Sequence, residues 1–531
     1  MWAKSGGSLG DDNGYDVAVS GTDGSVWVTG DISGPGLFDA GQEGEISTPS
    51  LGGADIFLAR YAADGGLSWV ATAGGESQEE PYSVAVDAAR NTAVIGGYFS
   101  GTATFGQGQT HETTLVAAGG WEDADLFVAR YDADGQLAWA KRAGSRKGEV
   151  TTAVAIDPRD GSVVAAGYYL DPFVFGAGEE NSVGIGKGLI FIAKYAIDGA
   201  VIWARGVAGV DPEDSFISGN VQNVAVNQAD GSIVVVGGFS KGLVFGAGEP
   251  NETVVTAIGE NDAYPADNYV AKYRADGMLA WAKDVDSNAN DLPSGLDVNA
   301  ADGSILLAGR LWETITFDPG EPTQVSLTAE AEINGYLAKL TAEGTVIWAR
   351  RDGGPYNVGT TDVKVDPRDG SVIACGVFTG QAILGAGQPN VTLLSNPCSY
   401  DCRAIYVAKY DAAGTLQWAE AGTGEGVNAP LAAAVDPRDG SPIIAGYFVY
   451  PMTFDLGEPD ERTLGPVGFY DMFVAKFSPT AFTRVPLDPP ALCLLIIAAG
   501  ACLGIYERRC RRRAGGGFRS WVIIDSSARR Q

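Results

Sequence analysis

Few residues in this sequence could support nucleophilic or metal chemistry. The chain has one histidine, His111, in the Gly/Thr-rich segment FGQGQTHETT. A histidine-dependent triad would have to use that residue, and a His/Cys zinc site would have almost no further ligands. We therefore expect no catalysis through histidine, and we interpret His111 as an exposed loop residue.

The cysteines offer a local disulfide rather than a metal centre. Cys398 and Cys402 (CSYDC) are close enough to pair in an oxidising compartment. A metal or redox pair is the alternative, but it lacks partners and the usual two-residue spacing. Cys375 lies in an apolar strand-like segment and is predicted to be a buried free thiol.

Aspartate and glycine gather in short repeated segments. DPRDGS occurs at 157–162, 366–371 and 436–441, and DADG at 132–135 and RADG at 274–277 belong to a second group. Calcium binding is one interpretation, because hard cations prefer carboxylate and carbonyl oxygens, but the segments lack the ligand run of an EF-hand. Tight turns explain them better, with Gly at positive φ and Asp capping the turn. No cofactor is predicted, and calcium stays as an alternative.

The elements that carry these turns follow from the tryptophans. Seven Trp residues begin similar Trp-Ala-Lys-like strands at steps of 67, 70, 64, 78, 67 and 70 residues. These repeat anchors are Trp2, Trp69, Trp139, Trp203, Trp281, Trp348 and Trp418. Because every copy carries one, we interpret them as packing residues between repeats rather than as a ring that stacks on a ligand.

Each period contains four predicted strands separated by turns. In the third copy these are 151–157, 162–169, 189–196 and 200–205. Four-stranded units that cannot bury both faces alone are expected to stack radially, which leaves only short edges. The sequence thus predicts an all-β fold, a seven-bladed β-propeller of four-stranded antiparallel blades over residues 1–478.

Closure of the ring is predicted from the two ends of the array. Residues 431–477 supply three strands of a seventh copy, but the Trp strand expected after Phe477 is missing. Residues 1–5 (MWAKS) precede any first strand and match it. We therefore predict that the N-terminal strand pairs with the last blade.

The segments SVAVD (83–87), GSVVAAGYY (161–169) and DLFVARYDADGQLAWAK (125–141) resemble the SBBP-type β-propeller repeat of bacterial surface and secreted proteins. The resemblance covers about residues 1–478. It implies the same fold and a surface or secreted location, but no particular activity.

The C-terminal region departs from the repeat. Residues 479–490 form a Pro-rich linker, 491–506 (ALCLLIIAAGACLGIY) an apolar segment, and 507–531 an Arg-rich tail. Sixteen residues span roughly 24 Å as a helix, slightly less than the ~30 Å of a bilayer core. A short transmembrane helix is one reading. The order VPLDPP, apolar helix and Arg cluster also resembles a PEP-CTERM-type sorting signal, although eighteen residues follow the Arg run.

Location is predicted from this tail. The Arg cluster places the end of the chain on the cytoplasmic side and the propeller outside, so we expect an extracellular or cell-surface protein that is anchored or processed at 491–506. The first residues, MWAKSGG, do not read as a signal peptide. We expect either a misassigned start or a fragment of a longer product.

Charge restricts the partners. The net charge is −30, and nine Arg against three acidic residues after position 480 leave +6 there and −36 on the repeats. So acidic a surface repels phosphate backbones, and no nucleic-acid partner is expected. We predict a non-enzymatic scaffold that binds a protein or polysaccharide on a propeller face, with membrane contact through 491–506.

The surface favoured for that ligand consists of the long second-to-third-strand connections, Ser100–Ala124, Gly242–Asn268 and Gly380–Ala404. The alternative function is a lyase or hydrolase that uses carboxylates at the channel mouth. It requires paired acids that converge from non-equivalent positions of different blades, with raised pKa values in one polar pocket.

Overall fold

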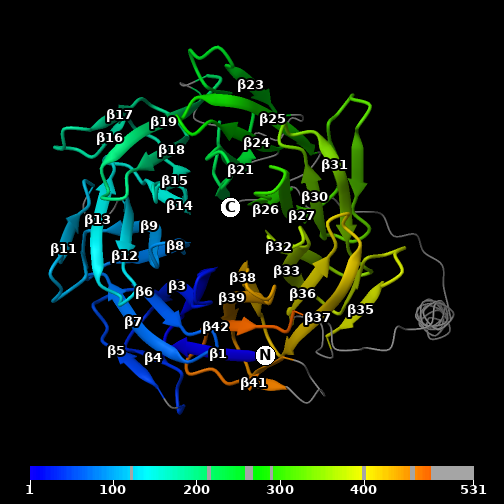
Figure 1. Cartoon of the computed structure of the whole chain (residues 1–531), viewed down its shortest axis with the longest axis horizontal. Coiled ribbons are helices and arrows are strands. Elements are labelled where there is room, and N and C mark those ends of the chain that lie inside the picture. Colours follow the sequence, from blue (N-terminus) through cyan, green and yellow to red (C-terminus); the bar gives the residue numbers. More distant parts are fainter. Residues whose placement is uncertain are drawn as a thin grey trace, which may run out of the picture. The chain divides into compact units, whose positions relative to one another are not determined.

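The chain folds as a ring of antiparallel sheets around a central channel (Figure 1). The computed structural model describes residues 1–479 except 43, 120–123, 212–213, 215–216, 258–266, 288–290, 397–401 and 455–460. Seven sheets form seven blades, so the predicted propeller is confirmed.

The strands of each blade follow one another from the channel outward. Blade 1 contains β2 (Asn13–Val19), β3 (Val26–Ile32), β6 (Asp55–Tyr61) and β7 (Leu67–Ala73). Blade 2 contains β8 (Glu79–Asp87), β9 (Thr92–Ser100), β12 (Ala124–Tyr131) and β13 (Leu137–Ala143). Blade 3 contains β14 (Val150–Ile156), β15 (Val163–Tyr168), β18 (Ile190–Tyr195) and β19 (Val201–Gly209). Blade 4 contains β20 (Asn223–Val226), β21 (Ile233–Phe239), β24 (Asp267–Tyr273) and β25 (Leu279–Ser287).

The remaining blades repeat this order. Blade 5 contains β26 (Leu292–Val298), β27 (Ile305–Leu311), β30 (Asn334–Leu340) and β31 (Val346–Asp352). Blade 6 contains β32 (Val358–Val365), β33 (Val372–Phe378), β36 (Ala404–Tyr410) and β37 (Leu416–Gly424). Blade 7 contains β38 (Ala429–Val435), β39 (Pro442–Phe448), β42 (Asp471–Lys476) and, from the start of the chain, β1 (Trp2–Gly7).

The sequence predicted no strands in the long second-to-third-strand connections, but the structure contains some. Each connection contains a short hairpin on the outer side of the ring. The hairpins are β4 (Gly36–Phe38) with β5 (Ile46–Thr48), β10 (Thr102–Phe105) with β11 (Thr113–Val116), β16 (Phe173–Phe175) with β17 (Val183–Ile185), β22 (Gly242–Phe245) with β23 (Thr253–Thr256), β28 (Thr314–Phe317) with β29 (Val325–Thr328), β34 (Gln381–Leu384) with β35 (Thr392–Ser395), and β40 (Met452–Phe454) with β41 (Arg462–Leu464). Four of them pair with the fourth strand of the preceding blade, which makes those sheets six-stranded.

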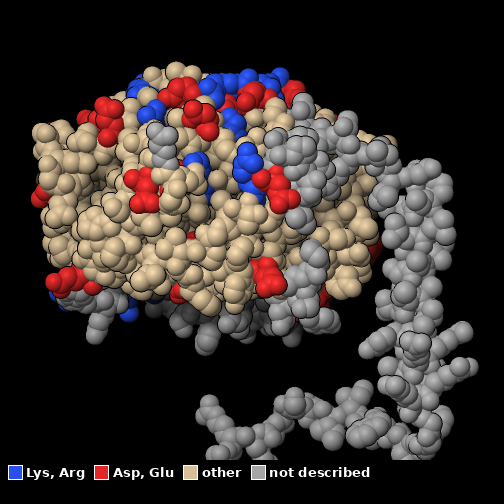
Figure 2. All heavy atoms as spheres, turned by 90° about the horizontal axis from the view of Figure 1, so that it is seen from below, with Lys and Arg blue, Asp and Glu red and all other residues tan. Residues whose placement is uncertain are grey.

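These hairpins form much of the outer wall of the propeller. In the side view of Figure 2, most of the visible wall is uncharged; many Lys, Arg, Asp and Glu side chains gather along one edge of the disc, and others are scattered over the wall and the opposite edge.

The N-terminal strand closes the ring as predicted. β1 pairs antiparallel with β42, from Trp2 opposite Lys476 to Gly6 opposite Met472. On its other side β1 pairs with β4 of blade 1. Figure 1 shows β1 and β42 side by side, so the two ends of the array share one sheet.

The core is divided into seven clusters, and each lies between two adjacent blades. One contains Leu58 of blade 1 with Phe127 and Tyr131 of blade 2. The cluster that joins blade 6 to blade 7 includes Ala3 of β1. Because each sheet buries its faces only against its neighbours, the stability of one blade depends on the next.

The seven repeat tryptophans lie at these interfaces. In six of them the indole Nε1–H donates to a backbone carbonyl in the third-to-fourth-strand turn of the next blade. The pairs are Trp2 with Ala63, Trp69 with Ala133, Trp139 with Ile197, Trp203 with Ala275, Trp281 with Ala342 and Trp348 with Ala412. Trp418 has no acceptor within the described part of the chain. Its neighbour is blade 7, whose fourth strand is β1 from the start of the chain, so no third-to-fourth-strand turn joins it to β42.

The sequence explained Gly135 only by backbone geometry, and the packing of these turns gives a second reason for a glycine there. Gly135 has a φ of +76°, and a Cβ atom there would meet the ring of Trp69 at 2.9 Å. Glycine is therefore required for its positive φ and also because the indole lies flat on the turn.

Residues 479–531 lie almost entirely outside the described range, so the predicted linker, apolar helix and Arg-rich tail stay predictions. Among the described residues, no helix has the length and apolar character needed to cross a bilayer.

Deleting residues 1–7 is expected to lower the thermal unfolding midpoint of the whole propeller, because β42 would become an unpaired edge and the blade 6–7 cluster would lose Ala3. Differential scanning calorimetry of the truncated chain tests this. A synthetic peptide MWAKSGG added in trans should restore part of the lost stability. An unchanged midpoint without the peptide would contradict the closure.

Trp203 and Trp418 form a matched pair for the indole hydrogen bond, since they are 7% and 8% exposed. Replacing either by Phe removes similar packing, but only Trp203→Phe also breaks a hydrogen bond. We expect Trp203→Phe to lower the free energy of unfolding by about 1 kcal/mol more than Trp418→Phe, measured by denaturant titration. Equal losses would show that the hydrogen bond adds nothing.

Candidate binding site in the channel and on the loop face

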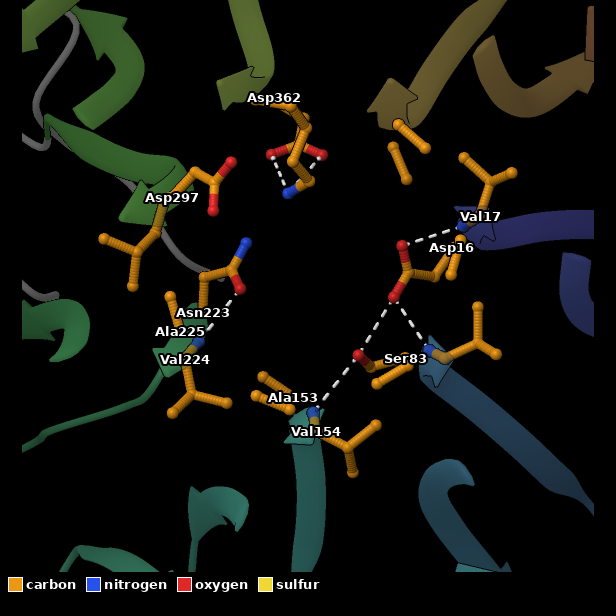
Figure 3. Close-up of a pocket in the computed structure, with 18 of the residues that line it drawn as sticks. Asp16, Val17, Ser83, Ala153, Val154, Asn223, Val224, Ala225, Asp297 and Asp362 are labelled. Atoms are coloured by element: carbon orange, nitrogen blue, oxygen red, sulfur yellow. Dashed lines mark hydrogen bonds and ion pairs between the residues drawn. The ribbon is translucent and has the colours of Figure 1, made fainter. Parts of the chain in front are cut away.

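The innermost strands of the seven blades line a central channel with a cavity of about 570 Å³ (Figure 3). In six of these strands a bulge shifts the register next to one residue. The residues directly after the unpaired position, which we call the bulge residues, are Asp16, Ser83, Ala153, Gly295, Asp362 and Ala432, and Asn223 begins the inner strand of blade 4. An innermost strand has one unpaired edge, so its backbone N–H groups need acceptors.

Polar bulge residues supply these acceptors to the next blade. Asp16 accepts hydrogen bonds from the backbone N–H of Val84 at 2.8 Å and from the Ser83 hydroxyl at 2.9 Å. Ser83 in turn accepts from the N–H of Val154 at 3.1 Å (Figure 3). Asp362 accepts from the N–H of Ala433 at 2.9 Å. The polar groups of the channel thus join consecutive blades.

Where the bulge residue has no polar side chain, the inner strand of the next blade supplies its own acceptor: one of its side chains accepts the backbone N–H of the following residue. Blade 7 contributes Ala432, and Asp16 of blade 1 accepts from its own neighbour Val17 at 2.8 Å. Blade 3 contributes Ala153, and in blade 4 the Asn223 side chain accepts from the N–H of Val224 at 2.9 Å. Blade 5 contributes Gly295, and Asp362 then caps Val363 at 2.8 Å. Blade 4 departs from this rule, because Asn223 Nδ2 donates to the Ser294 carbonyl of blade 5 at 3.4 Å while Asp297 caps Val298 at 2.8 Å.

Four charged groups gather in one part of this channel. Lys364 forms an ion pair with Asp362 at 3.1 Å, and Asp16 and Asp297 are its other charged neighbours. Burial raises the pKa of Asp16 to about 6, with Lys364 opposing the shift. Burial also raises the pKa of Asp297. Burial alone would lower the pKa of Lys364, but Asp362, Asp297 and Asp16 together raise it.

This cluster meets part of what the enzyme alternative requires. Asp297 stands two positions after the bulge of its strand, so carboxylates from non-equivalent positions do converge, and two of them have raised pKa values. However, Asp297 accepts from the N–H groups of Val298 and Val365 at 2.8 Å, and Asp16 and Asp362 are engaged as described above. All three carboxylates are used to join inner strands.

Short turns cover one face of the ring, which we call the turn face: the first-to-second-strand and third-to-fourth-strand turns. Here the DPRDG segments form a charged network that the sequence did not reveal. Asp157 is fully buried and accepts from Arg159 at 2.7 Å and from Lys194 at 3.0 Å. Burial opposes ionisation, but these hydrogen bonds lower the pKa of Asp157 to about 2. Arg159 also donates to the backbone of Asp230 in the next blade.

Asp366 with Arg368 and Lys409, and Asp436 with Arg438 and Lys476, repeat the arrangement. Arg438 donates to the Asp23 carbonyl of blade 1, so this network also crosses the closure. A Lys recurs in the third strand of these repeats, and this recurrence was the feature of the sequence that could have indicated the ion pairs. In the second group of turns, Asp132 accepts from the N–H groups of Asp134 and Gln136 at 2.9 Å, which is a turn cap. Among the described residues no group of three or more His, Cys, Asp or Glu could hold a metal ion.

The opposite face, which we call the loop face, carries the longer connections. Seven of the exposed large hydrophobic residues lie there, in or beside connections between blades or between second and third strands. They are Leu9, Tyr168, Leu170, Val210, Tyr356, Tyr450 and Phe469. Their exposure ranges from 38% to 88%. These residues come from connections distributed around the ring, and aromatic side chains of this kind are enriched in protein-binding surfaces.

The other predicted site residues are dispersed. His111 is exposed in the turn between β10 and β11, on the outer wall and away from the channel. Cys375 is a fully buried free thiol. Cys402 takes part in a disulfide bond, and Cys398, its predicted partner, lies outside the described residues, so that pairing stays a prediction. Parts of the three predicted binding connections also lie outside the described range.

The fold defines the class of this protein as a seven-bladed β-propeller. No family model matches the chain. An uncharacterized WD repeat-containing protein, L264, of Acanthamoeba polyphaga mimivirus is 23% identical over 407 residues, which cover 69% of this chain. The chain spans 29% of the length of that relative.

Solved structures share less sequence identity with this chain. The WD40 repeats of RRP9 cover 90% of this chain at 8% identity and a TM-score of 0.40. Sqt1 from Chaetomium thermophilum covers 83% at 12% identity and a TM-score of 0.41. The resemblances to SBBP repeats and to a PEP-CTERM signal stay predictions.

The buried carboxyl groups predict an unusual pH dependence of stability. Burial raises the pKa of Asp16 to about 6, of Asp31 to about 7 and of Glu79 to about 8. The folded state binds these protons at a higher pH than the unfolded state does, so stability falls as pH rises from 5 to 8. We expect the free energy of unfolding to be several kcal/mol greater at pH 5 than at pH 8, since each pKa unit contributes about 1.4 kcal/mol, measured by urea titration.

The triple variant Asp16→Asn/Asp31→Asn/Glu79→Gln should flatten this dependence. As a matched control, Glu76→Gln/Asp134→Asn/Glu343→Gln removes three exposed carboxylates and should leave the difference between pH 5 and pH 8 in place. If the control flattens the profile as much, the cause is overall charge and not burial.

Proposed function

We propose that this protein is a non-enzymatic scaffold, exposed at the cell surface or secreted, that binds a polypeptide partner on the loop face of its propeller. The observation that carries the proposal is the set of seven exposed apolar and aromatic residues on that face. Hydrogen bonds and ion pairs of the turn face and of the channel join the blades, so those groups are already engaged.

A surface or secreted location with attachment through residues 491–506 belongs to this proposal. The acidic composition of the propeller and the apolar segment followed by clustered Arg support it. A polysaccharide ligand is the other partner class that the sequence suggested. Large, partly exposed Tyr and Phe side chains serve protein contacts well, because they bury much area and lose few rotamers on binding.

A lyase or hydrolase remains the second candidate, and the converging carboxylates of Asp16, Asp297 and Asp362 favour it. The two candidates differ in what Asp16 does. For the scaffold, Asp16→Asn changes stability and leaves partner binding intact. For an enzyme, it abolishes turnover.

Two triple variants test the loop face against the outer wall. Tyr356→Ser/Tyr450→Ser/Phe469→Ser removes side chains that are 46%, 49% and 59% exposed on the loop face. Val116→Ser/Val254→Ser/Ile347→Ser removes side chains that are 58%, 54% and 52% exposed on the outer strands. We expect the loop-face variant to weaken attachment of the purified protein to the producing cells or their matrix at least about tenfold.

The outer-wall variant should attach as the unmodified protein does, because it also removes three half-exposed hydrophobic side chains but none from the loop face. Surface plasmon resonance on immobilised cell-surface extract gives the affinities, and calorimetry confirms that both variants fold. Normal attachment of the loop-face variant would overturn the proposed function.

A further inference from the structure

One cationic side chain in the channel differs from the other buried cations. Arg310 is the penultimate residue of β27, so it stands where the channel opens to the loop face, and it lines the cavity. A Cβ atom at Gly359 of blade 6 would approach the Arg310 Nε atom at 3.1 Å. The glycine therefore leaves the room that the guanidinium occupies.

Other buried cations of the propeller have carboxylate partners. Arg130 pairs with Asp87 at 2.9 Å, Lys194 with Asp157 at 3.0 Å and Lys409 with Asp366 at 3.2 Å. Within the described residues, Arg310 forms no ion pair and no side-chain hydrogen bond. A partly buried guanidinium without a counter-charge is costly, although the chain as a whole has a net charge of −30.

The charged neighbour of Arg310 is a second arginine. Burial, followed by repulsion from Arg403, lowers the pKa of Arg310, and the ring hydroxyls of Tyr447 and Tyr406 are its other electrostatic neighbours. Arg403 is exposed and precedes β36 on the loop face. Two guanidinium groups thus repel each other near the channel mouth, and an anion bound at Arg310 would supply the missing counter-charge and reduce the repulsion.

We propose that Arg310, together with Arg403, receives a carboxylate of the polypeptide that binds the loop face. This inference rests on the proposed function and names the chemistry of its central contact. A planar guanidinium holds a carboxylate through two parallel hydrogen bonds, which gives direction as well as affinity. The propeller repels long acidic runs, so the contact fits a single Asp or Glu in an otherwise uncharged segment.

The test uses the full chain and ligand-observed saturation-transfer NMR, which detects weak binding to a protein of 55.1 kDa. The probes are the blocked tripeptide Ac-Ala-Glu-Ala-NH2, its neutral counterpart Ac-Ala-Gln-Ala-NH2, and galacturonate as a sugar carboxylate. We expect the Glu peptide to bind about tenfold more tightly than the Gln peptide, and Arg310→Gln to remove that difference.

Arg146→Gln is the matched control. Arg146 is exposed in a connection on the same face, and the substitution removes the same charge. It should leave binding of the Glu peptide unchanged. Arg310→Gln should also keep or raise the thermal midpoint, because it removes a partly buried charge that has no counter-charge, so a loss of binding cannot be ascribed to unfolding.

Four results would overturn the inference: equal binding of the Glu and Gln peptides, retained binding in Arg310→Gln, equal loss in Arg146→Gln, or tighter binding of galacturonate than of the Glu peptide. If Arg310→Gln attaches normally to the cell surface while the loop-face triple variant does not, the carboxylate contact is wrong and the proposed function stands. If the triple variant attaches normally, the proposed function itself is wrong.

Discussion

The contact between one blade and the next is the interaction on which this structure depends. A four-stranded sheet with two apolar faces cannot be stable alone, and here each interface has its own cluster of buried side chains. The repeat Trp residues add a directional hydrogen bond to the apolar area that this contact buries. The indole ring of one blade packs on the turn glycine of the next blade, and its Nε1–H donates to a backbone carbonyl of the same turn. This contact fixes the position of each blade relative to the next, which apolar packing alone would not do.

The same requirement accounts for most of the charged residues on the turn face and in the channel. On the turn face, the buried Asp of each DPRDG segment orients an Arg that reaches the following blade. In the channel, Asp16 and Asp362 accept N–H groups from the inner strand that comes next. A buried carboxylate is expensive unless it is hydrogen-bonded. The hydrogen bonds that join the blades offset this cost, which is why acidic residues can line the channel.

The blade number and the closure could be predicted because they depend on features with long periods. The spacing of Trp69 and its counterparts counts the blades, and the unmatched MWAKS segment identifies the missing strand. The outer hairpins could not be predicted, since strands of three or four residues such as Phe173–Phe175 carry little periodicity. The Lys194–Asp157 pair was also missed. Its two residues lie 37 positions apart, and only the fold shows that the third strand returns to the first turn.

The contacts that hold the ring together also indicate where binding can occur. A group that caps a strand or pairs a buried charge cannot engage a partner without weakening the propeller, which excludes most polar residues of the channel and the turn face. The aromatic residues of the loop face, such as Tyr356 and Phe469 with their exposed rings, neither cap a strand nor pair a buried charge. Arg310 stands at the boundary between the two sets. It is positioned by the fold like a structural residue, but the described residues supply no carboxylate to it, so the electrostatic balance of the channel mouth is completed only by an anion from outside.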